Sequence, residues 1–107
     1  MKLWHNADDA PRVPSEVRSE QTVEIWVGTH PIEPGQHVTI NWNVTHANGA
    51  TRSGSVPAIW QYNDFSLGNS YWMARVGPFA VGDKVEYSVM GVSRGGTLSP
   101  QMFAFMV

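Results

Sequence analysis

Residues 70–92 read SYWMARVGPFAVGDKVEYSVMGV and carry the clearest structural pattern in the chain. Apolar side chains recur at every second position in two runs, which are Trp72, Ala74 and Val76, then Val85, Tyr87 and Val89. Alternation with a period of two is typical of strands that bury one face. Glycine and proline between the runs, at Gly77, Pro78 and Gly82, indicate turns. The stretch therefore predicts two β-strands joined at a corner.

The second run also places Tyr87 shortly after Gly82 and Asp83. This arrangement resembles the tyrosine corner of immunoglobulin-like and fibronectin-type-III sandwiches, in which the phenol hydroxyl bonds to nearby backbone. We expect Tyr87 to have the same structural role.

The rest of the chain supplies further strands. Residues 21–29, 37–47 and 101–107 alternate clearly, and 50–58 predicts a weaker strand at a sheet edge because it contains Gly54 and Pro57. Residues 59–69 have no clean period and predict either a long structured loop or a bulged strand. With turn signals about every 8–12 residues, the pattern predicts an all-β fold: an antiparallel, immunoglobulin/fibronectin-III-like β-sandwich of six to eight strands.

Length and composition indicate one domain that folds without disulfides, since 107 residues suffice for one core and no cysteine is present. Residues 1–19 are polar and carry two prolines, so we expect a lead-in segment or linker with room for an edge strand at 2–5. Residues 20–107 are expected to form the sandwich.

Charge and hydropathy exclude two classes of partner. Seven Lys and Arg oppose nine Asp and Glu, which leaves a net charge of −2 and no basic stripe for nucleic acid. No apolar run approaches the roughly 18 residues of a membrane span. We expect neither nucleic acid nor membrane as a partner.

One catalytic motif occurs, but its context is wrong. Residues 91–95, GVSRG, match the G-x-S-x-G nucleophile elbow, which requires a following helix and a histidine further along the chain. Gly96 follows the motif and all four histidines precede it. The sequence predicts a plain turn here, no catalytic residue and no enzyme.

Metal ligands are sparse as well. The histidines show none of the close pair spacings typical of zinc sites, so no metal-ligating residue and no cofactor are expected. The aspartates Asp8, Asp9, Asp64 and Asp83 leave a structural Ca²⁺ open as an alternative.

Tryptophan is over-represented, with five in the chain. Trp42 and Trp72 alternate with aliphatic residues and are expected in the core. Trp26 lies on the opposite face from Val23, Ile25 and Val27, so it is expected to be exposed. Trp4 lies in a polar segment and either clamps the terminus or binds a ligand.

Trp60 and Tyr62 are two residues apart and would share one face of a strand. Gln61, Asn63 and Asp64 flank them with groups that hydrogen-bond to hydroxyls. Exposed rings beside such groups suit a sugar, whose C–H face stacks on a ring while its hydroxyls meet the polar side chains. The candidate ligand-binding residues are Trp26, Trp60, Tyr62, Gln61, Asn63 and Asp64; the alternative is that Trp60 and Tyr62 plug the end of the sandwich.

A small, Trp-rich, cysteine-free β-sandwich of this kind resembles the non-catalytic carbohydrate-binding modules of glycoside hydrolases. Residues 71–87, YWMARVGPFAVGDKVEY, are also similar to the immunoglobulin-like starch-type modules of amylase-like enzymes. The resemblance implies a secreted module that is attached to the catalytic domain of a parent glycoside hydrolase. The module would target that enzyme to polysaccharide.

Separated Trp rings favour an extended β-glucan such as cellulose, xyloglucan or mixed-linkage glucan. The alternatives are a starch or α-glucan module, and a fibronectin-III-like spacer or protein-interaction domain.

Overall fold

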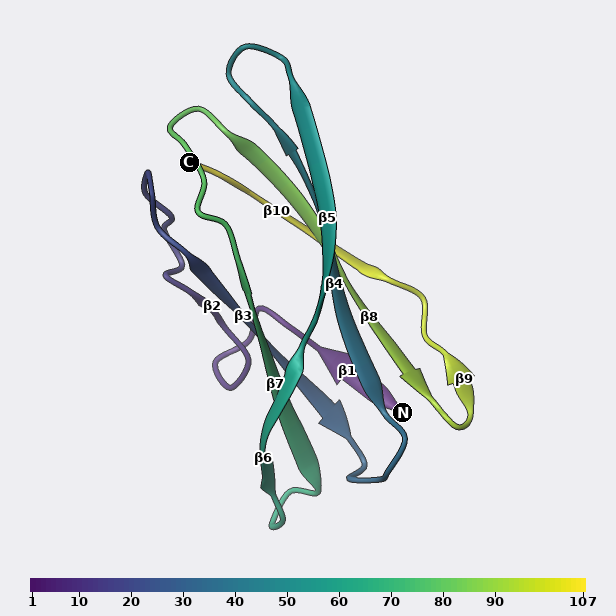
Figure 1. Cartoon of the computed structure of the whole chain (residues 1–107). Coiled ribbons are helices and arrows are strands. Elements are labelled where there is room, and N and C mark those ends of the chain that lie inside the picture. The colour runs from purple at the N-terminus through teal and green to yellow at the C-terminus, as the bar shows by residue number, and fades with distance from the viewer.

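The computed structural model describes all 107 residues and contains ten β-strands and no helix (Figure 1). The strands are β1 (Lys2–Trp4), β2 (Arg12–Val13), β3 (Val23–His30), β4 (His37–Thr45), β5 (Thr51–Pro57), β6 (Ile59–Asp64), β7 (Asn69–Val76), β8 (Lys84–Ser93), β9 (Gly96–Thr97) and β10 (Gln101–Met106). They form two antiparallel sheets. Sheet I has the order β1-β3-β7-β6 with β2 also paired to β3, and sheet II has the order β10-β8-β4-β5 with β9 also paired to β8.

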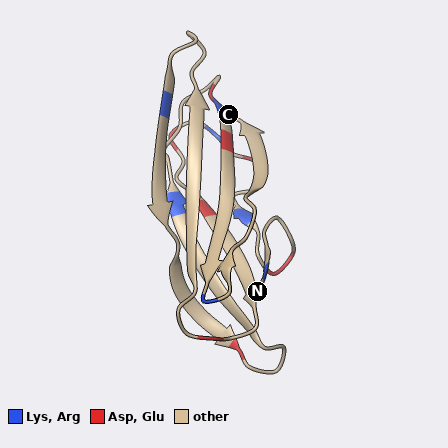
Figure 2. Cartoon of the chain, turned by 90° about the vertical axis from the view of Figure 1, so that its right-hand side faces the viewer, with Lys and Arg blue, Asp and Glu red and all other residues tan.

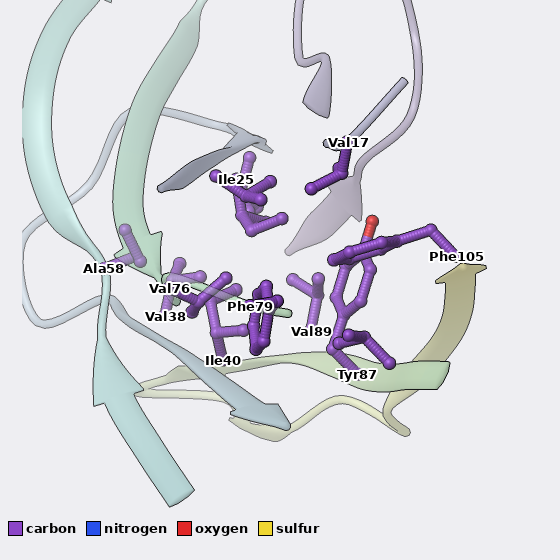
Figure 3. Packing of buried hydrophobic residues seen from close by; sticks show 14 of the residues in the cluster. Val17, Ile25, Val38, Ile40, Ala58, Val76, Phe79, Tyr87, Val89 and Phe105 are labelled. Carbon is purple, nitrogen blue, oxygen red and sulfur yellow. The ribbon is translucent and has the colours of Figure 1, made fainter. Parts of the chain in front are cut away.

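The predicted antiparallel β-sandwich is confirmed, and the alternating patterns explain its core. Val23, Ile25 and Val27 of β3 are fully buried, as are Val85 and Val89 of β8 in the other sheet. Each of these side chains points between the sheets because alternate residues of a strand face opposite ways. Figure 3 shows the buried side chains of the two sheets packed against one another.

The predicted corner connects the two sheets. β7 pairs with β3 and β6, whereas β8 pairs with β4 and β10, so residues 77–83 cross from one layer to the other. Phe79 in this crossing is only 2% exposed and contacts the rings of Trp42 and Phe105 edge-on. Sequence alternation did not indicate this core residue, because Phe79 lies in a loop.

Asp83 fixes the end of the crossing. Its carboxylate accepts hydrogen bonds from the backbone N–H of Ala80 at 2.9 Å and from His46 Nδ1 at 2.8 Å. These bonds, chiefly the one from Ala80, hold the pKa of Asp83 below its usual value.

Tyr87 is structural, with 1% of its surface exposed, but its hydroxyl does not bond to nearby backbone as expected. It lies 2.8 Å from His5 Nε2, and the Arg12 guanidinium donates to it at 3.2 Å. The expected backbone partner is replaced because the N-terminal segment lies over the hydroxyl. Arg12 also stacks on Phe105, 4.8 Å from the ring centre.

The segment 1–19 packs on the sandwich, and β1 is the edge strand for which residues 2–5 were expected to have room. β1 and β2 both pair with β3, and Leu3, His5 and Val17 are buried. Its few apolar residues are separated by polar ones without a clear period, so the sequence pattern did not reveal that they pack on the core.

The molecule is elongated, with principal extents of 45 × 24 × 17 Å. Its charged residues lie scattered over the face in Figure 2, with no continuous basic or acidic stripe. None of its elements is a helix that is long and apolar enough to cross a membrane.

Candidate functional site

A β-bulge in β6 determines where the predicted site residues point. Trp60 pairs with Trp72 of β7, but Tyr62 pairs with the very next residue back along β7, Tyr71. Gln61 is therefore an extra residue, and the expectation that Trp60 and Tyr62 share a face is wrong. Because a bulge adds one residue to the period of two, Trp60 faces the same side as Trp72 while Tyr62 faces the opposite side. Of the two readings open for residues 59–69, the bulged strand is the one observed.

Trp60 borders a depression at one end of the sandwich, which we call the end hollow. It has a volume of about 300 Å³ and lies between β6–β7 and the loop that joins β3 to β4. Its walls are Trp60, Asn63, Ser70, Trp72 and residues 32–36. Trp60 is 49% exposed although it points to the inner side, because β6 is an edge strand and the hollow leaves the ring open to solvent.

Hydrogen bonds hold the walls of the end hollow. Trp60 Nε1 and Ser70 Oγ both donate to Asn63 Oδ1, at 2.9 and 2.7 Å. Trp72 Nε1 donates to the buried Thr29 hydroxyl at 2.9 Å. The amide N–H groups of Asn63 have no partner in the chain, so they are free to donate to a ligand beside the Trp60 ring.

The loop side of the end hollow supplies a second set of polar groups. Gln36 is buried and accepts from the Thr29 hydroxyl while it donates to the carbonyl of Pro31 at 2.8 Å. Glu33 is exposed and makes no ion pair, so its carboxylate is an available acceptor. The hollow thus combines one exposed ring with at least one free donor and one free acceptor.

Tyr62 faces away from the end hollow, on the outer surface of sheet I. Its ring stacks on Tyr71 with a centroid distance of 5.0 Å and an interplanar angle of 28°, and it remains 49% exposed. Tyr71 donates its hydroxyl to Asp9 at 2.6 Å, and the pKa of Tyr71 is raised by burial and then by this bond. One face of the Tyr62 ring is therefore supported by protein and the other is open.

Trp26 also lies on the outer surface of sheet I, as expected, but it is partly buried. Its cross-strand neighbour is Met73, and its indole Nε1 donates to Glu24 at 3.1 Å. Glu24 also pairs with Arg75 at 3.2 Å. Trp26 is thus two strands away from Tyr62 and does not form a common platform with Trp60.

Two predicted residues have local structural contacts. Gln61 donates from its amide to the carbonyl of Ile59 at 3.0 Å. Asp64 Oδ1 accepts from the hydroxyl and N–H of Ser66 and from the N–H of Leu67, and the Ser66 hydroxyl is the main cause of its lowered pKa. Asp64 therefore shapes the turn between β6 and β7.

Residues that lay outside the predicted site also line the end hollow. Trp72 was expected in the core, and it both packs against the core and borders the hollow. Glu33 and Gln36 lie in a Pro-rich turn that gave no binding signal. A sequence pattern cannot show that this turn faces Trp60, because the two lie about 25 residues apart and meet only through the sheet pairing.

The G-x-S-x-G sequence and three of the aspartates have local structural roles. Ser93 ends β8, and its hydroxyl accepts from the N–H of Gly95 in the turn to β9, so the G-x-S-x-G sequence forms a strand–turn–strand and not a nucleophile elbow. No three His, Asp or Glu side chains group together as metal ligands. Asp9, Asp64 and Asp83 each accept bonds from different parts of the chain. Structural Ca²⁺ stays an untested prediction.

Comparisons with known proteins identify related enzymes. No family model matches the chain. The isomaltosyltransferase of Sporosarcina globispora is 38% identical over 84 residues, which are 78% of this chain and 7% of that protein. A cycloalternan-forming enzyme from Listeria monocytogenes, solved with a pentasaccharide substrate, matches the whole chain with a TM-score of 0.81 and 28% identity over 10% of its own length. A Listeria monocytogenes structure that contains α-D-glucose, β-D-glucose, magnesium and calcium matches equally well.

The chain is similar to a small β-sandwich segment of large carbohydrate-active enzymes. It spans about a tenth or less of those proteins, so it corresponds to an accessory domain within them. The expected resemblance to accessory domains of carbohydrate-active enzymes is therefore confirmed.

Proposed function

We propose that this chain is a glucan-binding accessory domain of a larger carbohydrate-active enzyme and has no catalytic activity of its own. The observation that carries the proposal is the half-exposed Trp60 ring on the wall of the end hollow, beside the free amide N–H groups of Asn63. A pyranose that stacks on Trp60 places its hydroxyls against Asn63 and Glu33. By analogy with base stacking, one such ring contributes about 1–3 kcal/mol, and each net hydrogen bond adds about 0.5–1.5 kcal/mol, so we expect binding in the millimolar range.

We further propose an α-glucan as the ligand in preference to a β-glucan. The preference for β-glucan rested on separated Trp rings that line a flat chain, but Trp60 and Trp26 lie on opposite sides of sheet I and offer no common plane. A concave hollow with one ring suits a short or curved glucan segment. The isomaltosyl group in the name of the similar Sporosarcina globispora enzyme agrees with this choice.

Affinity gel electrophoresis tests the proposal. Gels that contain dextran, amylopectin, xyloglucan or mixed-linkage β-glucan are compared with a gel without polysaccharide. We expect retardation by at least one α-glucan, weaker or no retardation by the β-glucans, and at least a fivefold loss of affinity in Trp60→Ala. The matched control is Met106→Ala, which removes an exposed apolar side chain, 63% against 49% for Trp60, from the outer surface of sheet II.

The outcomes separate the alternatives. Unchanged mobility of the wild type in every gel contradicts glucan binding and favours a fibronectin-III-like spacer. Retardation only by β-glucans overturns the α-glucan preference and leaves the accessory role intact. Release of reducing sugar from any of the four polysaccharides contradicts the absence of catalysis.

The location of the protein is also a proposal. A polysaccharide taken from the surroundings is too large to cross a membrane, so an enzyme that acts on it has to work outside the cell. We therefore propose that the domain acts in a secreted enzyme and that its only macromolecular partners are polysaccharide and the parent catalytic domain. Fractionation of the source cells, followed by detection of the domain in the medium or in the cell pellet, checks this.

A further inference from the structure

The outer surface of sheet I carries side chains in rows that cross the strands. The pairing registers place Trp4, Gly28, Tyr71 and Tyr62 in one such row, which we call the aromatic row. Its two ends are three strand spacings apart, about 14 Å. The neighbouring row contains Lys2, His30, Asn69 and Asp64, and we call it the polar row.

The aromatic row is a preformed surface. Gly28 leaves room for the Trp4 indole, because a Cβ at this position would lie 2.3 Å from the ring. Trp4 donates from its indole N–H to Asp9 and meets Tyr71 edge-on at 6.4 Å. Since Tyr71 in turn supports Tyr62, the open face of Tyr62 is held in position before any ligand arrives.

Hydrogen-bonding groups border the aromatic row along its length. Asn69 donates to the Tyr71 hydroxyl at 3.2 Å, and its carbonyl oxygen lies 3.1 Å from His30 Nδ1. Asp9 borders the row on the side of Trp4. These groups are a mixture of amide, imidazole and carboxylate, and the only charged side chains along the two rows are Asp9, Asp64 and Lys2. So few charges suit uncharged hydroxyls better than a charged partner.

We infer that the aromatic row is a second glucan-binding surface, independent of the end hollow, so that one domain binds two glucan segments at once. The inference rests on the proposed function. The bulge at Gln61 is its structural cause, because it turns two neighbouring aromatic residues of one strand to opposite sides of the sheet. A domain with two such surfaces cross-links neighbouring glucan chains and gains avidity on a polymer.

NMR titration of the indole N–H signals tests the inference, with isomaltotetraose and maltotetraose as probes. Trp60 reports on the end hollow and Trp4 reports on the aromatic row. In the wild type we expect both signals to shift. Trp60→Ala should keep the Trp4 shift, and Tyr62→Ala should keep the Trp60 shift while it weakens the response at Trp4 at least tenfold. Asn69→Ala should also weaken only the Trp4 response, and Tyr62→Phe should retain it.

Light scattering with dextran and amylopectin supplies the second readout. The wild type should raise the scattering of at least one polymer, and either single-surface variant should abolish that rise. Thermal melting shows whether each variant is folded, and the intact response of its other indole confirms it.

The results distinguish the inference from the proposed function. A shift at Trp60 alone, with one-to-one stoichiometry, contradicts a second glucan-binding surface and leaves glucan binding at the end hollow intact. The same outcome is expected if another protein covers the aromatic row. A shift at Trp4 alone overturns the double site as well. No shift at either indole contradicts both the inference and the proposed function.

Discussion

At the scale of single residues, His5 has a hydrogen-bond partner at each of its two ring nitrogens. It is buried, and its Nδ1 lies 2.6 Å from the carbonyl oxygen of Trp26 while its Nε2 lies 2.8 Å from the Tyr87 hydroxyl. A carbonyl only accepts, so Nδ1 carries the proton. Burial of the ring favours the neutral imidazole, in which Nε2 accepts from the Tyr87 hydroxyl.

The neutral state of His5 makes folding stability depend on pH. Burial, with a smaller effect of the Arg12 charge, lowers the pKa of His5 below its ordinary 6.5. Between the two pKa values the unfolded chain binds more protons than the folded one, so stability is full above about pH 6.5 and falls as the pH drops below it. We expect the urea midpoint to decrease between pH 7.5 and pH 5.

His5→Gln is the matched variant for this prediction. It removes the titrating group and keeps one donor and one acceptor, so its urea midpoint should vary less over the same pH range than that of the wild type. An equally steep dependence in His5→Gln would assign the effect to the other histidines and contradict the role of His5.

Gly28 is a second residue whose identity is set by a neighbour. Its absent side chain makes room for Trp4, so Gly28→Ala forces the indole away from Asp9 and Tyr71. Overpacking of this kind typically costs about 1–3 kcal/mol, and we expect that loss in the free energy of unfolding. Gly95→Ala is the control, because a Cβ there meets nothing closer than 3.7 Å. Equal stability of the two variants would contradict the packing argument.

At the scale of elements, the strands with alternating patterns could be predicted and the irregular ones could not. Val23, Ile25 and Val27 alternate in the sequence and are all buried in β3. Trp60 and Tyr62 were assigned to one face because a regular strand was assumed, and one extra residue reversed that assignment. Nothing in the chemistry of Gln61 marks it as the bulge, since the bulge depends on how β7 pairs with β6.

The bulge leads to a specific prediction for deletion of Gln61. Without the extra residue, Trp60 and Tyr62 become consecutive and still point to opposite sides, so both can keep their partners Trp72 and Tyr71. We expect a folded protein that retains glucan binding at Trp60. Circular dichroism measures whether the variant is folded, and affinity gels measure whether it still binds glucan.

Deletion of Asn63 is the contrasting variant, because this residue lies in the regularly paired part of β6. Its loss shifts the register by one and reverses the face of every residue on one side of the deletion. We expect a marked loss of stability relative to the Gln61 deletion. If the Gln61 deletion were the more damaging of the two, the bulge would be essential to the fold and the argument from strand periodicity would fail.

At the scale of the whole molecule, the sandwich brings together groups that are distant in sequence. The end hollow needs β6, β7 and the turn after β3, and the aromatic row needs β1, β3, β7 and β6. Single residues of these sites, such as Trp60 and Asn63, carried a recognisable signal in the sequence. The sequence did not show that these residues belong to two separate surfaces. That separation depends on sheet pairing and on the N-terminal segment, whose polar composition resembles that of a linker.

The distribution of charge over the molecule leads to the last prediction. Both surfaces consist of rings and hydrogen-bonding groups, and charged residues are scattered with a net charge of −2 (Figure 2). A ligand that carries no charge feels little of the protein's field, and salt screens mainly interactions between charges. We therefore expect the affinity for a neutral glucan to change by less than about twofold between 50 and 500 mM NaCl, measured by calorimetry. A ligand held by its charge would lose affinity steeply over this range, so a tenfold loss would contradict recognition by stacking and neutral hydrogen bonds.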